Sequence, residues 1–411
     1  MFLAYFFCFL YAAHVALDIF LNLAQIRFAR KARGEKPTLL SNEDWIKSAD
    51  YEIARLRFET LHIAISALIL IAWFLAGFNL LDRAIAIDNA ALKAAIFIAS
   101  VATISGVLNI PFDYYKTFAI DEKFGFSRLT KKLFWLDTIK GIAALFILFF
   151  IVAFAIASAI SLTYTIVSVI TSFEADYAIA LILFAVCMFF IALANLLFPY
   201  FAKLFNKFEQ IDDTPLGAKI KTLLDEAGFS AKGVFKIDAG KRDSRLNAYF
   251  AGVGKTKRVA LFDTLIDKLS ENEILAVLGH ELGHFKHKDI LKRMVAIGVM
   301  ILVLSFLFVS VINPDFCAAL NLPNTPHIWL TVFSMLVMQP IAFFFQPFMN
   351  ALSRRAEFAA DSYGANLTNK TDLKNALIKL ATENKSFPKK RAIYALWNET
   401  HPNILTRIER L

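Results

Sequence analysis

Residues 141–163 read GIAALFILFFIVAFAIASAISLT and contain no charged side chain. A helix needs about 20 mostly apolar residues to cross the hydrocarbon core of a bilayer, so this stretch predicts a membrane-spanning helix. The uncharged run continues to Phe173, and we expect residues 162–173 to lie at the membrane interface. The same length criterion predicts six further spans. They cover residues 1–25, 61–81, 91–110, 177–202, 294–313 and 328–349.

The composition of the whole chain also points to a membrane protein. Of its 411 residues, 58% are hydrophobic and 19% are charged, whereas soluble domains have about 45–50% apolar and about 25% charged residues. The net charge is +9, but the basic residues flank the apolar segments and are not interleaved with aromatic residues on one polar stretch, which argues against nucleic-acid binding. The three cysteines show neither paired nor metal-type spacing, so we expect no disulfide framework and no cysteine metal site.

The basic residues predict the orientation of the spans. A basic cluster at residues 27–36 follows the first span, which is the wrong polarity for a cleaved signal peptide, so we expect a retained span with its N-terminus outside. The positive-inside rule then places four segments in the cytoplasm. They are residues 27–60, 111–140 and 203–293 and the tail from Ser353. The polar insert 203–293 and the tail are therefore predicted to lie on the same side of the membrane.

Within the polar insert, the pattern changes to that of a small mixed domain. Proline after Thr214 and glycine at 228 predict a helix over residues 216–227. Three short runs rich in β-branched and aromatic residues predict strands. These runs cover residues 234–237, 247–250 and 258–262. Ser270 and Glu273 form a capping-box pattern, which predicts the start of another helix.

That last helix contains the motif HELGH at residues 280–284. Residues i and i+4 lie on one face of a helix, so His280 and His284 can direct their imidazoles at one metal ion. Glu281 lies about 100° further round the helix and can reach a water molecule beside the metal. Two histidines leave a tetrahedral zinc site short of one protein ligand, because a hydrolytic site has three and a water.

The tail offers the missing ligand. Glu357 and Asp361 are four residues apart and therefore share a helix face, just after the seventh span and on the predicted side of the insert. We expect Glu357 to complete the metal site and Asp361 to hold a ligand imidazole by its other nitrogen.

At this point the sequence resembles the type I CAAX prenyl proteases, which are integral-membrane zinc endopeptidases. The resemblance covers nearly the whole chain, including the seven predicted spans. The matching residues are 121–126 (DEKFGF) with Asp137 and Lys140, 247–250 (NAYF), 257–265 (KRVALFDTL), 280–284, Ser353 and Arg354 with Glu357 and Asp361, and His401 and Pro402 with Arg407.

The resemblance implies a barrel of seven helices around an intramembrane chamber, capped on the cytoplasmic side by a gluzincin-like zinc domain with a small sheet. It implies that Asn247, Ala248 and Tyr249 lie on an edge strand to which an extended substrate adds. His401 and Arg407 are implied to lie near the zinc, with His401 in a catalytic role and Arg407 in contact with substrate. Arg354 is implied to support the site.

Further expectations concern organisation and setting. Four parts are predicted: five spans in 1–202, a catalytic insert in 203–293, a span hairpin in 294–349 and the rest of the catalytic domain in 350–411. Arg245, where eukaryotic members of the family usually have histidine, together with a short N-terminus and compact loops, suggests a bacterial member, located in the inner membrane.

The predicted function is hydrolysis of peptide bonds, with one zinc ion, in CAAX-type or membrane-associated protein substrates, lipidated ones included. Membrane lipids are the other expected partners, and the sequence gives no oligomeric state. Two alternatives stay open: a quality-control metalloprotease of the heat-shock type, and, more distantly, a transporter or lipid-binding protein without enzymatic activity.

Overall fold

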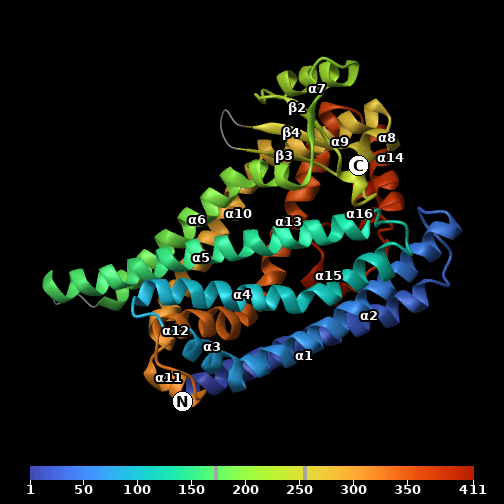
Figure 1. The fold of residues 1–411 in the computed structure, drawn as a ribbon. Helices are drawn as coiled ribbons and strands as arrows, with labels where there is room; N and C mark the ends of the chain where they lie inside the picture. Colours follow the sequence, from blue (N-terminus) through green and yellow to red (C-terminus); the bar gives the residue numbers. More distant parts are fainter. Residues whose placement is uncertain (171–174, 253–256) are drawn as a thin grey trace.

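The structure is a computed structural model that describes residues 1–170, 175–252 and 257–411. Its N-terminal part consists of five long helices and the short helix α3, with two π-helical segments (Figure 1). These elements are α1 (Phe2–Ala32), α2 (Asn42–Ala72), η1 (Trp73–Gly77), α3 (Phe78–Ala84), α4 (Ala90–Tyr115), η2 (Lys116–Asp121), α5 (Lys131–Ile170) and α6 (Ala175–Phe205).

The rest of the chain contains a small sheet, its surrounding helices and two further spans. The insert comprises β1 (Phe208–Gln210), α7 (Pro215–Glu226), β2 (Val234–Ile237), η3 (Ala239–Lys241), β3 (Ala248–Ala251), β4 (Arg258–Phe262), α8 (Asp263–Lys268) and α9 (Glu271–Lys286). It is followed by α10 (Asp289–Val311), α11 (Pro314–Ala319), α12 (Pro326–Val332), η5 (Phe333–Met338), α13 (Gln339–Leu367), α14 (Lys370–Glu383), α15 (Ala392–Asn398) and α16 (Ile404–Arg410).

The seven predicted spans are confirmed as helices long and apolar enough to cross a membrane. Several of these helices extend well past the predicted spans at the end nearest the sheet. The second begins at Asn42, although its apolar part begins near Leu61, and the seventh continues to Leu367. The expected interfacial stretch 162–173 is helical as far as Ile170, and its last residues lie outside the described ranges.

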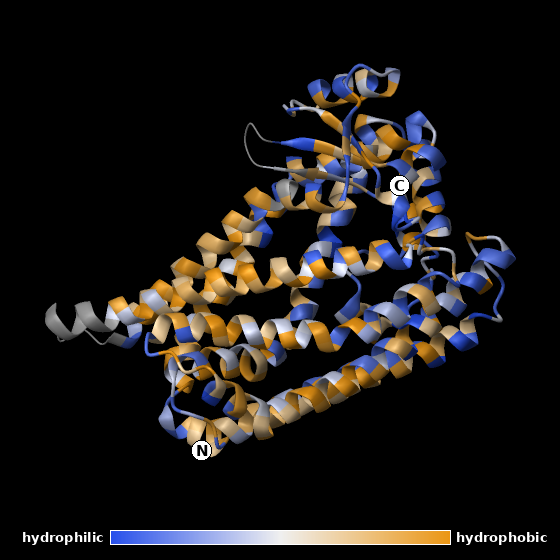
Figure 2. Ribbon diagram, in the orientation of Figure 1, coloured by the Kyte–Doolittle hydropathy of each residue, from blue (hydrophilic) through white to orange (hydrophobic). Residues whose placement is uncertain are grey.

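The membrane helices pack against one another in pairs. The contacting pairs are α1 and α2, α4 and α5, α5 and α6, and α6 and α10, and α13 contacts α1. At most 39% of the residues in the apolar window of any span are buried within the protein, so other parts of the chain leave much of the surface of each helix uncovered. Figure 2 shows hydrophobic residues along these helices and hydrophilic residues concentrated around the sheet and at the ends.

The sheet has the strand order β1-β2-β4-β3, so β3 lies at one edge. β2 and β4 are parallel, and the two outer pairs are antiparallel. Strands β2 and β4 have the predicted bounds, β3 is shifted by one residue, and β1 was not predicted. Val234 and Val259 are fully buried and belong to one apolar cluster with Ile274 and Leu278 of α9, which fixes α9 against the sheet.

Candidate metal centre

Helix α9 begins with the capping box that the sequence predicts. The hydroxyl of Ser270 accepts a hydrogen bond from the backbone N–H of Glu273, and the Glu273 carboxylate accepts one from the N–H of Ser270 at 2.7 Å. These bonds satisfy N–H groups that a helix start otherwise leaves without partners. Two to three turns further on, His280 and His284 have ring centroids 4.8 Å apart.

Two glycines allow α9 and α13 to pack very closely. A Cβ atom on Gly283 would lie 2.7 Å from Cα of Ala360, and one on Gly364 would lie 2.6 Å from the backbone nitrogen of His280. Both distances are shorter than any ordinary contact, so side chains at these positions would force the helices apart. The close crossing brings Glu357 of α13 to the two histidines of α9.

The predicted ligands lie together. Nε2 of His280 is 3.5 Å from Oε2 of Glu357, and Nε2 of His284 is 3.3 Å from Oε1 of the same carboxylate. One ligand atom from each of the three residues lies within 4.8 Å of the others. Bonds of about 2.0–2.1 Å in a tetrahedral zinc site put ligand atoms about 3.4 Å apart, so these separations suit a single ion.

The surroundings of the Glu357 carboxylate also favour a bound metal ion. The residue is only 4% exposed, and its buried Oε2 accepts no hydrogen bond from the residues that the structure describes, although Nη1 of Arg407 lies 3.2 Å away. Burying a carboxylate oxygen without full compensation is costly. A cation between Glu357 and the imidazoles would remove that cost, and the residues therefore fit a metal.

Each imidazole is held from behind by a carboxylate. Nδ1 of His280 lies 2.9 Å from Oδ1 of Asp361, as the spacing of Glu357 and Asp361 suggested. Nδ1 of His284 lies 3.1 Å from Oδ2 of Asp289, which sequence reasoning missed. Such contacts fix the ring orientation and leave Nε2 free to bind metal.

Arg407 lies on the Asp361 side of the centre. Its Nε and Nη2 donate to the two Asp361 oxygens at 2.8 and 2.6 Å, and the residue is 7% exposed. In this arrangement the guanidinium fixes the carboxylate that in turn orients His280. Contact between Arg407 and substrate stays a prediction.

His401 and Arg354 occupy different positions relative to the ligands. Nε2 of His401 lies 3.2 Å from Oε1 of Glu357, and its side chain is 60% exposed, so it borders the open side of the centre. Among the described residues, no hydrogen bond or ion pair joins Arg354 to a predicted ligand. Its Nη1 donates to the backbone carbonyls of Ala395 and Glu399, at 3.2 and 2.7 Å, and so holds the segment just before His401.

The environment of the centre favours a positive charge at His284 and raises the proton affinity of Glu281. Burial lowers the pKa of His284, but hydrogen bonds to Glu357 and Asp289 outweigh this effect and raise the pKa to about 9. Burial also raises the pKa of Glu281, even though the neighbouring histidines oppose the shift. A glutamate whose pKa is raised toward neutrality is better suited to exchange protons than an exposed one.

The predicted substrate strand is an edge strand. β3 is the last strand in the order of the described sheet and pairs with β4, with Tyr249 opposite Ala260. Asn247, just before β3, is exposed, and Ala248 is buried. The residue before Asn247 is held by Asn384 of the tail, whose side chain accepts from the Leu246 N–H at 2.8 Å and donates to the Leu246 carbonyl at 3.2 Å.

Comparisons with known proteins agree with this architecture. The family description "CAAX prenyl protease N-terminal, five membrane helices" matches residues 25–207, and "Peptidase family M48" matches residues 210–411. A CAAX prenyl protease 1 homolog of Dictyostelium discoideum is 31% identical over 90% of this chain and 86% of its own length. CAAX prenyl protease 1 of Saccharomyces cerevisiae is 31% identical over 77% of this chain and 71% of its own length.

The crystal structure of S. mikatae Ste24p has the same fold, with a TM-score of 0.86 and 25% identity over 100% of this chain and 99% of that one. The seven apolar helices, the sheet domain and the cluster of candidate metal ligands thus occur together in a chain whose relatives share both halves of its sequence. The chain belongs to the CAAX prenyl protease 1 family and is a multi-pass membrane metallopeptidase that acts on peptide or protein substrates.

Proposed function

We propose that the protein is a zinc endopeptidase in which His280, His284 and Glu357 hold one zinc ion. The observation that supports this most strongly is the convergence of two imidazole nitrogens and a buried carboxylate on one point, at separations that suit tetrahedral coordination. A zinc ion there would supply Lewis-acid chemistry, activating water and polarising the scissile carbonyl.

Glu281 acts as the general base. It lies on the helix that presents His280 and His284, and burial raises its pKa. The carboxylate accepts a proton from the attacking water and passes it to the leaving amine, so that one group serves both proton transfers.

His401 stabilises the developing oxyanion. Its exposed imidazole borders the ligand Glu357, on the open side that a substrate must approach. Hydrogen-bond donors aimed at the position where charge develops contribute strongly in a site that excludes water. Arg354 acts indirectly, by holding the segment before His401, and Arg407 fixes Asp361 and is a candidate substrate contact.

The substrate is an extended peptide that adds to the free edge of β3. Asn247, Ala248 and Tyr249 would bind its main chain by strand addition, because β3 is the last strand in the order of the described sheet. The names of the related proteases suggest CAAX-type substrates, and a prenyl group on the peptide would be accommodated among the membrane helices.

The setting follows from the distribution of charge. We place the catalytic part on the cytoplasmic side of a bacterial inner membrane, because the insert and the tail lie at the end of the spans that is rich in Lys and Arg. We retain the division into 1–202, 203–293, 294–349 and 350–411, in which the catalytic domain is made from the insert and the tail.

The first experiment measures hydrolysis of a farnesylated CAAX peptide by the purified protein in detergent, together with its zinc content. Wild type should cleave the peptide, a chelator should abolish cleavage, and Glu281→Gln should keep its zinc and lose at least about a hundredfold in rate.

Each result bears on a separate part of the proposal. Full activity in a zinc-loaded Glu281→Gln protein would refute the role of that residue. Unchanged zinc content in Glu357→Ala would refute the third ligand. A zinc-loaded wild type that cleaves unmodified membrane proteins but no CAAX peptide would refute the substrate class and leave the metal centre intact.

A further inference from the structure

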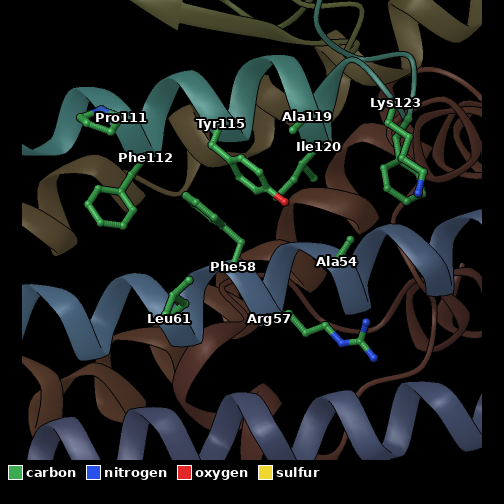
Figure 3. A pocket seen from close by; sticks show the side chains of 11 residues that line it. Ala54, Arg57, Phe58, Leu61, Pro111, Phe112, Tyr115, Ala119, Ile120 and Lys123 are labelled. Atoms are coloured by element: carbon green, nitrogen blue, oxygen red, sulfur yellow. The ribbon is translucent and has the colours of Figure 1, made fainter.

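A cavity of about 510 Å³ lies between α2 and the C-terminal part of α4 with η2, away from the metal centre (Figure 3). Phe58 and Leu61 line it from α2, and Phe112 and Tyr115 line it from α4. Figure 3 shows the rings of Phe58 and Tyr115 projecting into the space between the two helices. The interior is therefore mainly apolar and aromatic.

Two cationic residues line this cavity toward its catalytic end. Lys123 approaches it from the η2 side, whereas Figure 3 shows the guanidinium of Arg57 directed to the side of α2 away from the rings; both residues are exposed. Among the described residues, no carboxylate lies within ion-pairing distance of either of them, whereas the adjacent Arg55 pairs with both Glu52 and Glu59. The guanidinium of Arg57 and the ammonium of Lys123 are thus available to an external anion.

The apolar and cationic ends of the cavity are arranged along the membrane normal. Leu61 is at the start of the apolar part of its span, and Arg57 lies one turn, or about 6 Å, further toward the catalytic end. Figure 3 shows Leu61 and Phe112 toward one end of the cavity and Lys123 toward the other. A molecule filling the site would have its apolar part at membrane depth and its anionic part at the membrane surface.

The position of the helices identifies which surface this is. Nearby on α2, Tyr51 donates to Asp121 and accepts from Arg245 of the insert, and Glu52 pairs with Lys390 of the tail. The cationic end of the cavity therefore faces the leaflet on the catalytic side.

We propose that this cavity binds one anionic phospholipid of that leaflet. Lys123 contacts the headgroup phosphate, Arg57 joins it when its exposed, flexible side chain turns toward the cavity, and an acyl chain lies along Phe58, Leu61, Phe112 and Tyr115. Basic pockets between membrane helices favour anionic headgroups, and each Lys or Arg near the surface strengthens such binding severalfold. The binding is independent of the metal centre and of any peptide substrate.

The test titrates the full-length protein in detergent with phosphatidylglycerol or phosphatidylcholine and counts retained lipids by native mass spectrometry. We expect one phosphatidylglycerol to bind at least tenfold more tightly than phosphatidylcholine. R57Q/K123Q should lose this preference, and R57K/K123R should keep it. The matched control is K131Q/K132Q, which removes two exposed cations near the same membrane end but outside the cavity and should bind as wild type does.

A second readout locates the acyl chain. Y115W places a tryptophan at the apolar wall, and phosphatidylglycerol with brominated chains should quench its fluorescence in this variant but not in Y115W/R57Q/K123Q. Wild type corrects for the five native tryptophans.

Several results would overturn the proposal. Equal retention by R57Q/K123Q, in a protein that elutes as a single folded species, would show that the cations do not form the site. Displacement of the lipid by inorganic phosphate at equal concentration would indicate a site for the free anion. Displacement by one equivalent of a farnesylated peptide would indicate a site for substrate.

Discussion

The two imidazoles of the metal centre depend on single carboxylates behind them. Asp361 orients His280 and is itself fixed by Arg407, while Asp289 orients His284. The chain thus has two positioning carboxylates. Asp361 is held by a buried arginine and Asp289, within the described residues, is not, so the effect of each can be measured separately.

We predict that Asp289→Asn weakens zinc affinity by about 10- to 100-fold, the usual effect of losing a partner behind a metal-binding histidine. Asp361→Asn should weaken it more, because it also leaves the buried Arg407 without one of its two carboxylates. Competition with a chromophoric chelator measures both affinities. Asp267→Asn, at an exposed position of α8, is the control, and equal affinities in all three variants would contradict the assignment.

A second residue-level prediction concerns Asn384. Its side chain holds both backbone groups of Leu246, directly before the proposed substrate strand. Asn384→Ala should therefore raise KM for a peptide severalfold while leaving zinc content unchanged. Asn384→Asp keeps the acceptor for the Leu246 N–H and should be less affected. A fall in kcat at constant KM in Asn384→Ala would instead indicate a disturbance of the metal centre.

At this scale the sequence predicts residues that share a helix and misses those that meet through a turn. The i, i+4 rule paired His280 with His284 and Glu357 with Asp361, and all four lie together. Asp289 was missed because it reaches back past Lys288, whose left-handed backbone (φ 56°) ends one helix and starts another. Nothing in the sequence reports that turn.

Among the elements, the crossing of α9 and α13 decides whether the metal ligands meet. We predict that Gly283→Ala lowers zinc affinity and activity by at least tenfold, because its methyl group would lie 2.7 Å from Cα of Ala360 and push Glu357 away from the histidines. Zinc analysis and peptide hydrolysis check this. Gly298→Ala in α10 is the matched control. Its Cβ would meet only the end of Met188 at 3.5 Å, so activity should be retained.

A further element-level prediction tests the capping box. Ser270→Ala removes the acceptor for the Glu273 N–H and should cost about 1 kcal/mol of stability, the usual value for such a cap. Thermal unfolding of the metal-free protein measures the loss. Ser230→Ala, outside any described helix or strand, should leave the midpoint unchanged; an equal fall in both would contradict the capping role.

The elements were predicted well where a periodic or apolar pattern extends over many residues. The seven spans and strands β2 and β4 agree with their patterns. β1 was missed because three residues hold too little pattern to recognise, and the extensions of the spans were missed because their polar residues, such as Asn42 to Glu52, satisfy no hydropathy criterion.

For the whole molecule, ion pairs fix the catalytic part to the membrane helices. Arg242 of the insert makes a two-pronged contact with Asp137 of α5, at 2.7 and 3.0 Å, and both side chains are less than 20% exposed. We predict that Asp137→Ala lowers stability by about 1.5–3 kcal/mol, the range for hydrogen bonds to charged groups. Asp50→Ala removes the exposed pair with Arg33 and should change little. Detergent unfolding curves that coincide for the two variants would contradict the prediction.

The arrangement of the metal ligands along the chain has a consequence for biogenesis. His280 and His284 precede the last two spans, and Glu357 follows them. During synthesis, the histidines therefore emerge while the third ligand is still unmade, and the carboxylate reaches them only after α10 and α13 have entered the bilayer as a hairpin. With the proposed ligands, a nascent or unassembled polypeptide lacks a complete centre, and proteolytic competence would be gained only at the final step of membrane insertion.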